Sequence, residues 1–277
     1  MSGLWIAAGG HLCYTGDRNI GSLFRRKKRA GFDPLSFFEK ELLMQKELFD
    51  LEGRSVTLFR QADPSILFLQ PVDEHDEGLL DRQIEAIKGA QLPFALAAFS
   101  IRDWNKELSP WEAPPVFGKQ PFGGGAGETL AFLTERLLPA LRERCAMGKE
   151  IALCLGGYSL AGLFALWAGT QTSLFTGLAA ASPSVWFPGW LDYVKANPIS
   201  APYVYLSLGD REERAKNPVM ASAGNCIREQ YALLQGEHCA ALEWNPGNHF
   251  QQSEQRTAKA FLWLARQIAA EGEKPCL

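Results

Sequence analysis

A serine in a tight glycine turn is the first feature of this sequence that points to chemistry. Ser159 follows two glycines and a tyrosine (156–158), and it lies between a short apolar run (151–155) and a helical pattern (160–167). This strand–turn–helix order is typical of a nucleophile elbow, in which small neighbours let strand and helix pass and the serine stands at a helix N-terminus. The segment therefore predicts a nucleophilic serine.

The residues around this serine depart from the usual pattern at one position. Gly-x-Ser-x-Gly is the common form, whereas here Ala161 follows Leu160 and the glycine comes one residue later, at Gly162. Alanine is the next smallest residue, so strand and helix can still pass closely. Because short motifs also occur by chance, an ordinary glycine-rich turn with an incidental serine is the alternative interpretation.

A serine hydroxyl needs an adjacent base, which a third group must orient. Only two of the four histidines, His238 and His249, follow Ser159 in the chain. His238 precedes the last predicted strand (239–244) and would lie at the wrong end of the sheet. His249 follows that strand, at the edge where open α/β sheets bind ligands. We therefore predict His249 as the base; the alternative is an ordinary surface-loop histidine.

Three carboxylates compete for the role of the orienting acid. Asp210, Glu212 and Glu213 all follow the predicted strand 202–209. At most one of them can hold the imidazole, and the other two would be solvated loop charges. The third position after Gly209 favours Glu212, with Asp210 as the second choice.

The oxyanion of an acyl-transfer intermediate needs two backbone donors. The first is expected from the N–H of Leu160, directly after the nucleophile, and the second from the loop after the predicted strand 65–72. Pro71 has no N–H. Val72 or Asp73 must therefore supply the second donor.

Strands alternate with helices along most of the chain, which is typical of an α/β fold with a mostly parallel sheet. A hairpin is predicted first (46–52 and 55–60, around Gly53-Arg54). The further strands are 65–72, 93–101, 151–155, 177–181, 202–209 and 239–244, and the helices are 79–87, 129–144 with an interruption at Pro139, 160–167, 219–234 and 250–269. We expect helices on both faces of the sheet, and a functional loop at 102–127.

Two segments are predicted. Residues 1–45, with a basic run at 25–29, form an irregular extension packed on the body, and residues 46–277 form a single domain. The basic run indicates a solvated surface loop, with binding of an anionic partner as the alternative.

Composition narrows the classes of function. The 277 residues carry a net charge of -3, which argues against a nucleic-acid partner. The six cysteines form no Cys-x-x-Cys pair. This spacing suggests neither a zinc site nor a disulfide framework, so a reducing, cytoplasmic location is expected. We see no signal peptide and no apolar run long enough to span a membrane, which agrees with that location. The sequence shows no metal-ligand cluster and no nucleotide-binding loop, so no cofactor is predicted. The oligomeric state stays open.

Five segments together resemble the α/β-hydrolase superfamily, and within it the group of esterase D-like and enterochelin-esterase-like enzymes. They are 103–111, 122–126, 157–162, 181–186 and 247–249, and the resemblance covers roughly residues 50 to 270. It implies an α/β-hydrolase fold, with Ser159 and His249 as nucleophile and base. Gln70-Pro71 replaces the Asp-Gly that this group often has after the third strand.

The predicted function is that of a serine esterase, which cleaves a small-molecule carboxylic ester through an acyl-enzyme. An acyltransferase or peptidase on the same triad, or an inactive binding protein with this fold, are the alternatives. Tyr158, Trp186, Trp104 and Arg102 are candidates for substrate contacts. Core packing for the tryptophans, and a salt bridge for Arg102, are the competing interpretations.

Overall fold

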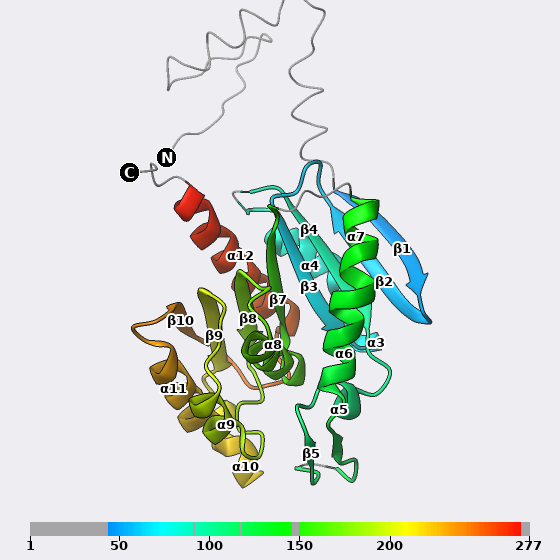
Figure 1. Cartoon of the computed structure of the whole chain (residues 1–277). Coiled ribbons are helices and arrows are strands. Elements are labelled where there is room, and N and C mark those ends of the chain that lie inside the picture. Colours follow the sequence, from blue (N-terminus) through cyan, green and yellow to red (C-terminus); the bar gives the residue numbers. More distant parts are fainter. Residues whose placement is uncertain (1–43, 91, 117, 146–149, 273–277) are drawn as a thin grey trace, which may run out of the picture. The chain divides into compact units, whose positions relative to one another are not determined.

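A mostly parallel sheet forms the centre of the structure, a computed structural model that describes residues 44–90, 92–116, 118–145 and 150–272 (Figure 1). The extension predicted for residues 1–45 lies outside the described residues, apart from its last two positions. In the described part of the chain the sheet has eight strands, in the order β1-β2-β4-β3-β7-β8-β9-β10. These strands are β1 (Gln45–Leu51), β2 (Arg54–Arg60), β3 (Ile66–Val72), β4 (Phe94–Ser100), β7 (Ala152–Tyr158), β8 (Gly177–Ala181), β9 (Tyr203–Gly209) and β10 (Cys239–Asn245).

In the eight-stranded sheet two strand pairs are antiparallel and the other five are parallel. β1 pairs with β2, and β2 with β4, in antiparallel register, while β4, β3, β7, β8, β9 and β10 run parallel to one another. The prediction of a mostly parallel sheet with an N-terminal antiparallel hairpin is therefore confirmed. The hairpin turn consists of Glu52 and Gly53, both at positive φ (54° and 76°), so Arg54 belongs to β2 and not to the turn. Positive φ at both central residues gives the twist that a two-residue hairpin favours.

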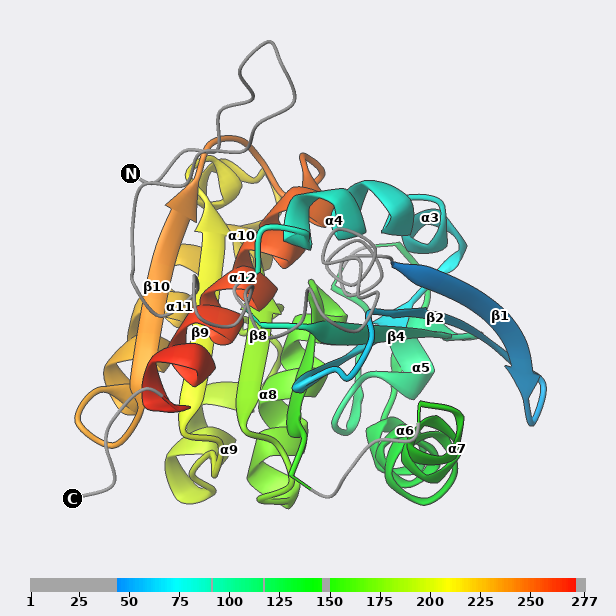
Figure 2. The same cartoon turned by 90° about the horizontal axis from the view of Figure 1, so that it is seen from above.

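Helices cover both faces of the sheet, as Figure 2 shows from above. α4 (Leu80–Ile87) and α12 (Ser253–Gly272) pack on one face, where β3 contributes Ile66 and Phe68. The other face, with Leu67 and Leu69 of β3, carries the remaining large helices. These are α6 (Ala126–Phe132), α7 (Leu138–Arg144), α8 (Leu160–Gln171), α9 (Trp190–Ala196) and α11 (Ala223–Leu234). Because side chains alternate along a strand, neighbouring residues of β3 supply opposite cores.

Two predicted helices differ in detail from the structure. The helix predicted from residue 129 begins at Ala126 and runs without a break through a wide turn, η2 (Leu133–Leu137), into α7, so the interruption predicted at Pro139 is replaced by this wide turn just before it. The helix predicted for 219–234 is split into α10 (Pro218–Ala221) and α11. The long loop after β4 contains α5 (Trp104–Glu107) and a two-stranded ribbon, β5 (Glu112–Ala113) with β6 (Phe122–Gly123). Short α3 (Glu74–Glu77) follows β3, and η3 (Glu212–Arg214) follows β9.

Candidate active site

Ser159 occupies a strained turn between β7 and α8. β7 ends at Tyr158 and α8 begins at Leu160, so the turn consists of the serine alone, with φ 57° and ψ -118°. A non-glycine residue in such a conformation costs on the order of 1–3 kcal/mol and persists only where its surroundings enforce it. The strain holds the Ser159 hydroxyl above the carboxyl end of β7, at the N-terminus of α8.

Because Gly157 has no side chain, the turn has room for the methyl group of Ala161. A Cβ atom on Gly157 would lie 2.5 Å from the Cβ of Ala161, closer than side chains approach. A Cβ on Gly162 would lie 3.1 Å from the Gly157 carbonyl oxygen and from Pro183 Cβ. The turn therefore needs glycine at 157, while the methyl group of Ala161 fills the space above it.

The described residues bring Ser159, His249 and Glu212 into one hydrogen-bonded chain. His249 Nε2 lies 2.9 Å from Ser159 Oγ, and His249 Nδ1 lies 2.7 Å from Glu212 Oε2. The three residues follow β7, β9 and β10, whose carboxyl ends share one edge of the parallel sheet. His238 lies at the opposite edge, with its Nδ1 2.9 Å from the Ala201 carbonyl oxygen.

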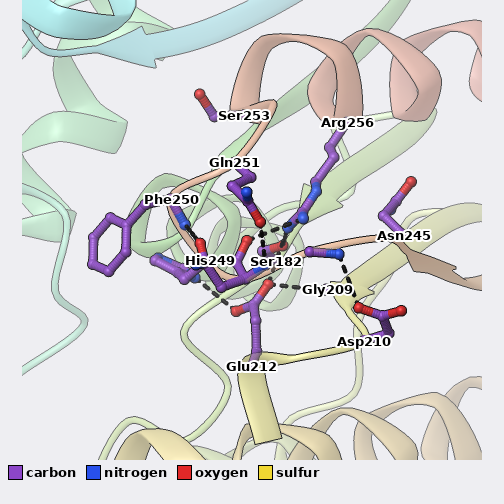
Figure 3. A network of polar contacts seen from close by, with 12 residues as sticks. Ser182, Gly209, Asp210, Glu212, Asn245, His249, Phe250, Gln251, Ser253 and Arg256 are labelled. Atoms are coloured by element: carbon purple, nitrogen blue, oxygen red, sulfur yellow. Dashed lines mark hydrogen bonds and ion pairs between the residues drawn. The ribbon is translucent and has the colours of Figure 1, made fainter. Parts of the chain in front are cut away.

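The other two candidate acids have different partners. Asp210 Oδ1 accepts a hydrogen bond from the Gly247 N–H at 2.8 Å (Figure 3), and so it ties the loop after β9 to the loop that carries His249. Glu213 binds Arg228 of α11, with Oε1 2.7 Å from Nη2. Of the three carboxylates, Glu212 is the one that reaches the imidazole.

Arg256 of α12 binds Glu212 and the loop that leads to His249 (Figure 3). Only 1% of its surface is exposed. Nη1 donates to Tyr158 Oη, Ser182 Oγ and Glu212 Oε1 at 2.9 to 3.2 Å, and Nη2 donates to the carbonyl oxygens of Pro246 and Asn248, both at 3.0 Å. One guanidinium thus fixes the acid and the loop that leads to His249.

Sequence reasoning missed Arg256, although one signal was present. Arg256 lies in the first turn of α12, which begins at Ser253. A cation is unfavourable near a helix N-terminus, so a basic residue there suggests that an anion compensates it. Ser184 was also missed as a neighbour of Ser159, with its Oγ 3.4 Å from Ser159 Oγ.

Glu212 stays ionised although only 7% of it is exposed. Burial favours the neutral acid, but the hydrogen bond and charge of His249, with hydrogen bonds from the Gly209 N–H and Ser182, outweigh burial and lower the pKa of Glu212 below its ordinary value. Arg256 Nη1, 3.2 Å from Oε1, adds a cation beside the carboxylate. The site therefore presents a carboxylate to the imidazole at neutral pH.

The predicted oxyanion donors lie at the carboxyl ends of two neighbouring strands, β3 and β7, or directly after them. Leu160 is the first residue of α8, so its N–H has no partner within the helix. Val72 is the buried last residue of β3, which pairs with β7, and Asp73 follows it as the N-cap of α3, accepting from the Asp76 N–H at 2.8 Å. Gln70 and Pro71 stand where the group often has Asp-Gly. The side chain of Gln70 is buried, and its Oε1 accepts a hydrogen bond from Gln83 Nε2 at 2.6 Å.

Of the four residues that we predicted to contact the substrate, three have other roles in the structure and one lines a cavity. Tyr158 Oη donates to the His249 carbonyl oxygen at 2.8 Å and accepts from Arg256, so its hydroxyl is already used inside the protein. Arg102 Nη2 donates to the Gly53 carbonyl oxygen at 2.6 Å, in the β1–β2 turn, and Trp104 packs against the core. Trp186 is the one of the four that lines the cavity beside His249.

Solved structures resemble this arrangement in shape, although no family model and no curated protein matches the sequence. An IroE-like serine hydrolase from Shewanella oneidensis superposes with a TM-score of 0.66 at 15% identity, over 82% of this chain and 81% of that one. The siderophore hydrolase EstA from Aspergillus nidulans gives 0.60 at 19% identity, over 86% and 98%. The enterobactin esterase FES from Shigella flexneri gives 0.59 at 17% identity, over 82% and 60%.

The chain has the α/β-hydrolase fold. In an α/β-hydrolase the nucleophile follows a central strand, and the acid and the histidine follow later strands in that order. Ser159, Glu212 and His249 occupy that order here, after β7, β9 and β10. In the ranges that the structure describes, no helix is long and apolar enough to cross a membrane, and no cluster of three or more His, Cys, Asp or Glu side chains could hold a metal ion.

A carboxyl group of α3, Asp76, makes the stability of the folded chain depend on pH. Burial, together with the charges of Asp73 and Glu254, raises the pKa of Asp76 to about 7. Between pH 4 and 7 the unfolded chain releases this proton while the folded chain keeps it. Stability is therefore lost as pH rises through that window, by up to about 4 kcal/mol for this group.

We expect Asp76→Asn to stabilise the protein at pH 8 by about 2 kcal/mol and to have little effect near pH 4.5, since the amide cannot ionise. Urea unfolding at both pH values measures this difference. Glu74→Gln, an exposed acid in the same short helix, is the control for removal of one negative charge. An equal gain for Asp76→Asn at both pH values would contradict the prediction.

Proposed function

We propose that this chain is a serine hydrolase that cleaves a small-molecule carboxylic ester through an acyl-enzyme. The observation that carries the proposal is the unbroken chain from Ser159 Oγ through His249 to Glu212, with distances of 2.9 and 2.7 Å, at a strained turn. A structural serine has no need of positive φ, of an imidazole or of a buried carboxylate behind it. Nucleophilic catalysis needs all three.

In the first half of the reaction, Ser159 Oγ attacks the ester carbonyl carbon while His249 Nε2 takes the hydroxyl proton. Negative charge develops on the carbonyl oxygen, where the N–H of Leu160 and that of Val72 or Asp73 are the proposed donors. The intermediate collapses, the bond to the alcohol oxygen breaks, and His249 Nε2 gives the proton to the leaving alcohol. The acyl group stays on Ser159.

In the second half, water attacks the acyl-enzyme, with His249 again acting as the base, and the acid product leaves with Ser159 restored. Glu212 accepts the Nδ1 proton of His249 throughout, which keeps Nε2 directed at the serine. Its carboxylate also stabilises the imidazolium that forms in each half. The reaction uses the chain's own groups and water, so we propose no cofactor.

The names of the structural neighbours support an ester as the substrate class. The matched chains are described as a serine hydrolase, siderophore hydrolases and an enterobactin esterase. A small-molecule ester is therefore the class that we propose here, in preference to a peptide or a thioester.

A fluorophosphonate probe tests the proposal directly, because it labels a serine only where a base activates it. We expect stoichiometric labelling of the purified protein at Ser159, identified by mass spectrometry of the tryptic peptide, and no labelling of Ser159→Ala. Ser184→Ala keeps the nucleophile and is expected to label. An unlabelled, folded parent protein would favour the inactive binding protein instead. Product analysis with competing alcohols, and a peptide panel, separate an esterase from an acyltransferase and a peptidase.

A further inference from the structure

We propose that the cavity beside His249 receives the alcohol part of the ester, and that this part carries a negative charge. The proposal rests on the hydrolase function above and names the substrate class of the same site. The cavity has a volume of about 460 Å³ and is lined by Arg211, Arg214 and Lys216, together with His249, Phe250 and Trp186. Its basic residues lie in and around η3, the short turn that also carries Glu212.

The positive charge of this wall is not neutralised by the protein. In the part of the chain that the structure describes, no carboxylate forms an ion pair with Arg211, Arg214 or Lys216. Glu212 is the acid that lines the cavity, and it is already bound to His249 and Arg256. The neighbouring Glu213 is turned toward α11, where Arg228 binds it.

The local charge is also opposite to that of the whole chain. Three cations line one cavity in a protein whose net charge is -3. Like charges that gather without counter-ions repel each other, and a bound anion relieves that repulsion. We therefore infer that an anionic group is the natural occupant of this wall.

The position of the cavity relative to the triad decides which part of the ester enters it. His249 lines the cavity, whereas Ser159 does not. Ser159 keeps the acyl group, and the imidazole gives its proton to the leaving alcohol, which must lie on the histidine side. A group held in this cavity therefore belongs to the alcohol.

Arginine and lysine at this wall fit a carboxylate or another oxyanion. A guanidinium binds such groups through paired N–H donors, and an ammonium binds them as a point charge. Phe250 adds an apolar surface: 86% of it is exposed, and its ring stands edge-on to the His249 ring with 5.5 Å between centroids. The alcohol that fits best has an anionic group joined to a short apolar part.

Two matched pairs of esters test the proposal. The first pair carries the charge on the alcohol side: 3-carboxyphenyl butanoate and its neutral amide, 3-carbamoylphenyl butanoate. The second pair carries it on the acyl side: the phenyl monoester of succinate and that of succinamic acid. For each pair we measure the ratio of kcat/KM, charged over neutral, so that intrinsic differences between the esters cancel when variants are compared.

The parent is expected to prefer the anionic alcohol, and the cavity variant Arg211→Gln/Arg214→Gln/Lys216→Gln is expected to reduce that ratio about tenfold, which is about twofold for each exposed charge. The control Lys88→Gln/Arg142→Gln/Arg266→Gln removes the same charge from exposed positions outside the cavity and should keep the parent's ratio. Because the wall is exposed, 0.5 M NaCl should lower the ratio of the parent and hardly change that of the cavity variant.

Three results would overturn the proposal: an unchanged ratio in the cavity variant, an equal loss in the control, or a shift in the acyl-side pair in place of the alcohol-side pair. Hydrolysis of the neutral butanoate by the parent, together with probe labelling at Ser159, shows that the hydrolase function stands in those cases. If the folded parent neither labels nor hydrolyses any of the four esters, the proposed function fails, and the assignment of this cavity fails with it.

Discussion

Glu212→Gln is expected to lower kcat about 10⁴-fold while leaving the protein folded. The reason lies in the partners of the two oxygens. Oε1 accepts hydrogen bonds from the Gly209 N–H at 2.8 Å and from Arg256 Nη1 at 3.2 Å, and both partners can only donate. A glutamine must therefore place its carbonyl oxygen there and turn its NH₂ group toward His249 Nδ1.

That orientation forces the wrong tautomer on His249. Nδ1 must accept from the amide, so the ring proton moves to Nε2, which then cannot accept the proton of Ser159. In a serine protease the corresponding acid-to-amide change preserves the geometry and costs about 10⁴ in kcat, or about 5.5 kcal/mol of barrier. Steady-state hydrolysis of an activated ester measures the loss.

Asp210→Asn and Glu213→Gln are the matched controls, since both acids belong to the same loop. Asp210 accepts from a backbone N–H and Glu213 binds Arg228, so neither touches the imidazole. We expect each control to stay within a few-fold of the parent. If Glu212→Gln retains more than a tenth of kcat, or Asp210→Asn falls as far, Glu212 is not the orienting acid.

Arg256→Met is expected to cost about 3–5 kcal/mol of stability, because it leaves the buried Glu212 carboxylate without its cation. Methionine fills much of the space but cannot donate to the carbonyl oxygens of Pro246 and Asn248. The loop that carries His249 is then free to shift. A misplacement of about 1 Å at a catalytic group can cost about 10²-fold in rate, so kcat should fall by that order.

Urea unfolding measures the stability change, and kcat is measured well below the melting temperature so that unfolded protein does not contribute. Lys259→Met is the control on the same helix: its ammonium pairs with Glu243 at 2.7 Å at an exposed position. Such a pair is worth about 0–1 kcal/mol, so kcat should not change. Arg256→Lys keeps the charge but has one nitrogen for five acceptors, and we expect an intermediate loss. A stable, fully active Arg256→Met protein would contradict the positioning role.

The sequence was sufficient to predict the fold and the order of the candidate triad, because both depend on local patterns. Short apolar strands, helical spacing and the small residues around Ser159 can be recognised within a few positions. The edge of the sheet at which His249 lies follows from parallel connectivity alone. Each of these features depends on the residues of a single element or on the order of the elements along the chain.

What the sequence left open depends on directions of side chains in space. Asp210, Glu212 and Glu213 lie within four positions, and only the turn of η3 decides which of them faces the imidazole. In the sequence Arg256 resembles an ordinary solvated charge on a helix, because the groups that it binds belong to other elements: β7, the loop after β8 and the loops after β9 and β10. Arg102 binds the turn between the end of β1 and the start of β2, a contact between distant parts of the chain that no local pattern reveals.

The position of Arg256 in α12, after all three candidate triad residues, has a consequence for the order in which the site is assembled during synthesis. Glu212 and the nucleophile turn emerge first, but the cation that secures them belongs to α12, whose Phe261, Leu264 and Ala265 pack into the core on the same face. Because synthesis proceeds from the N-terminus, α12 follows Ser159, Glu212 and His249 out of the ribosome. A chain cut before residue 253 would contain all three of these residues but would lack Arg256, which holds Glu212 and the loop that leads to His249.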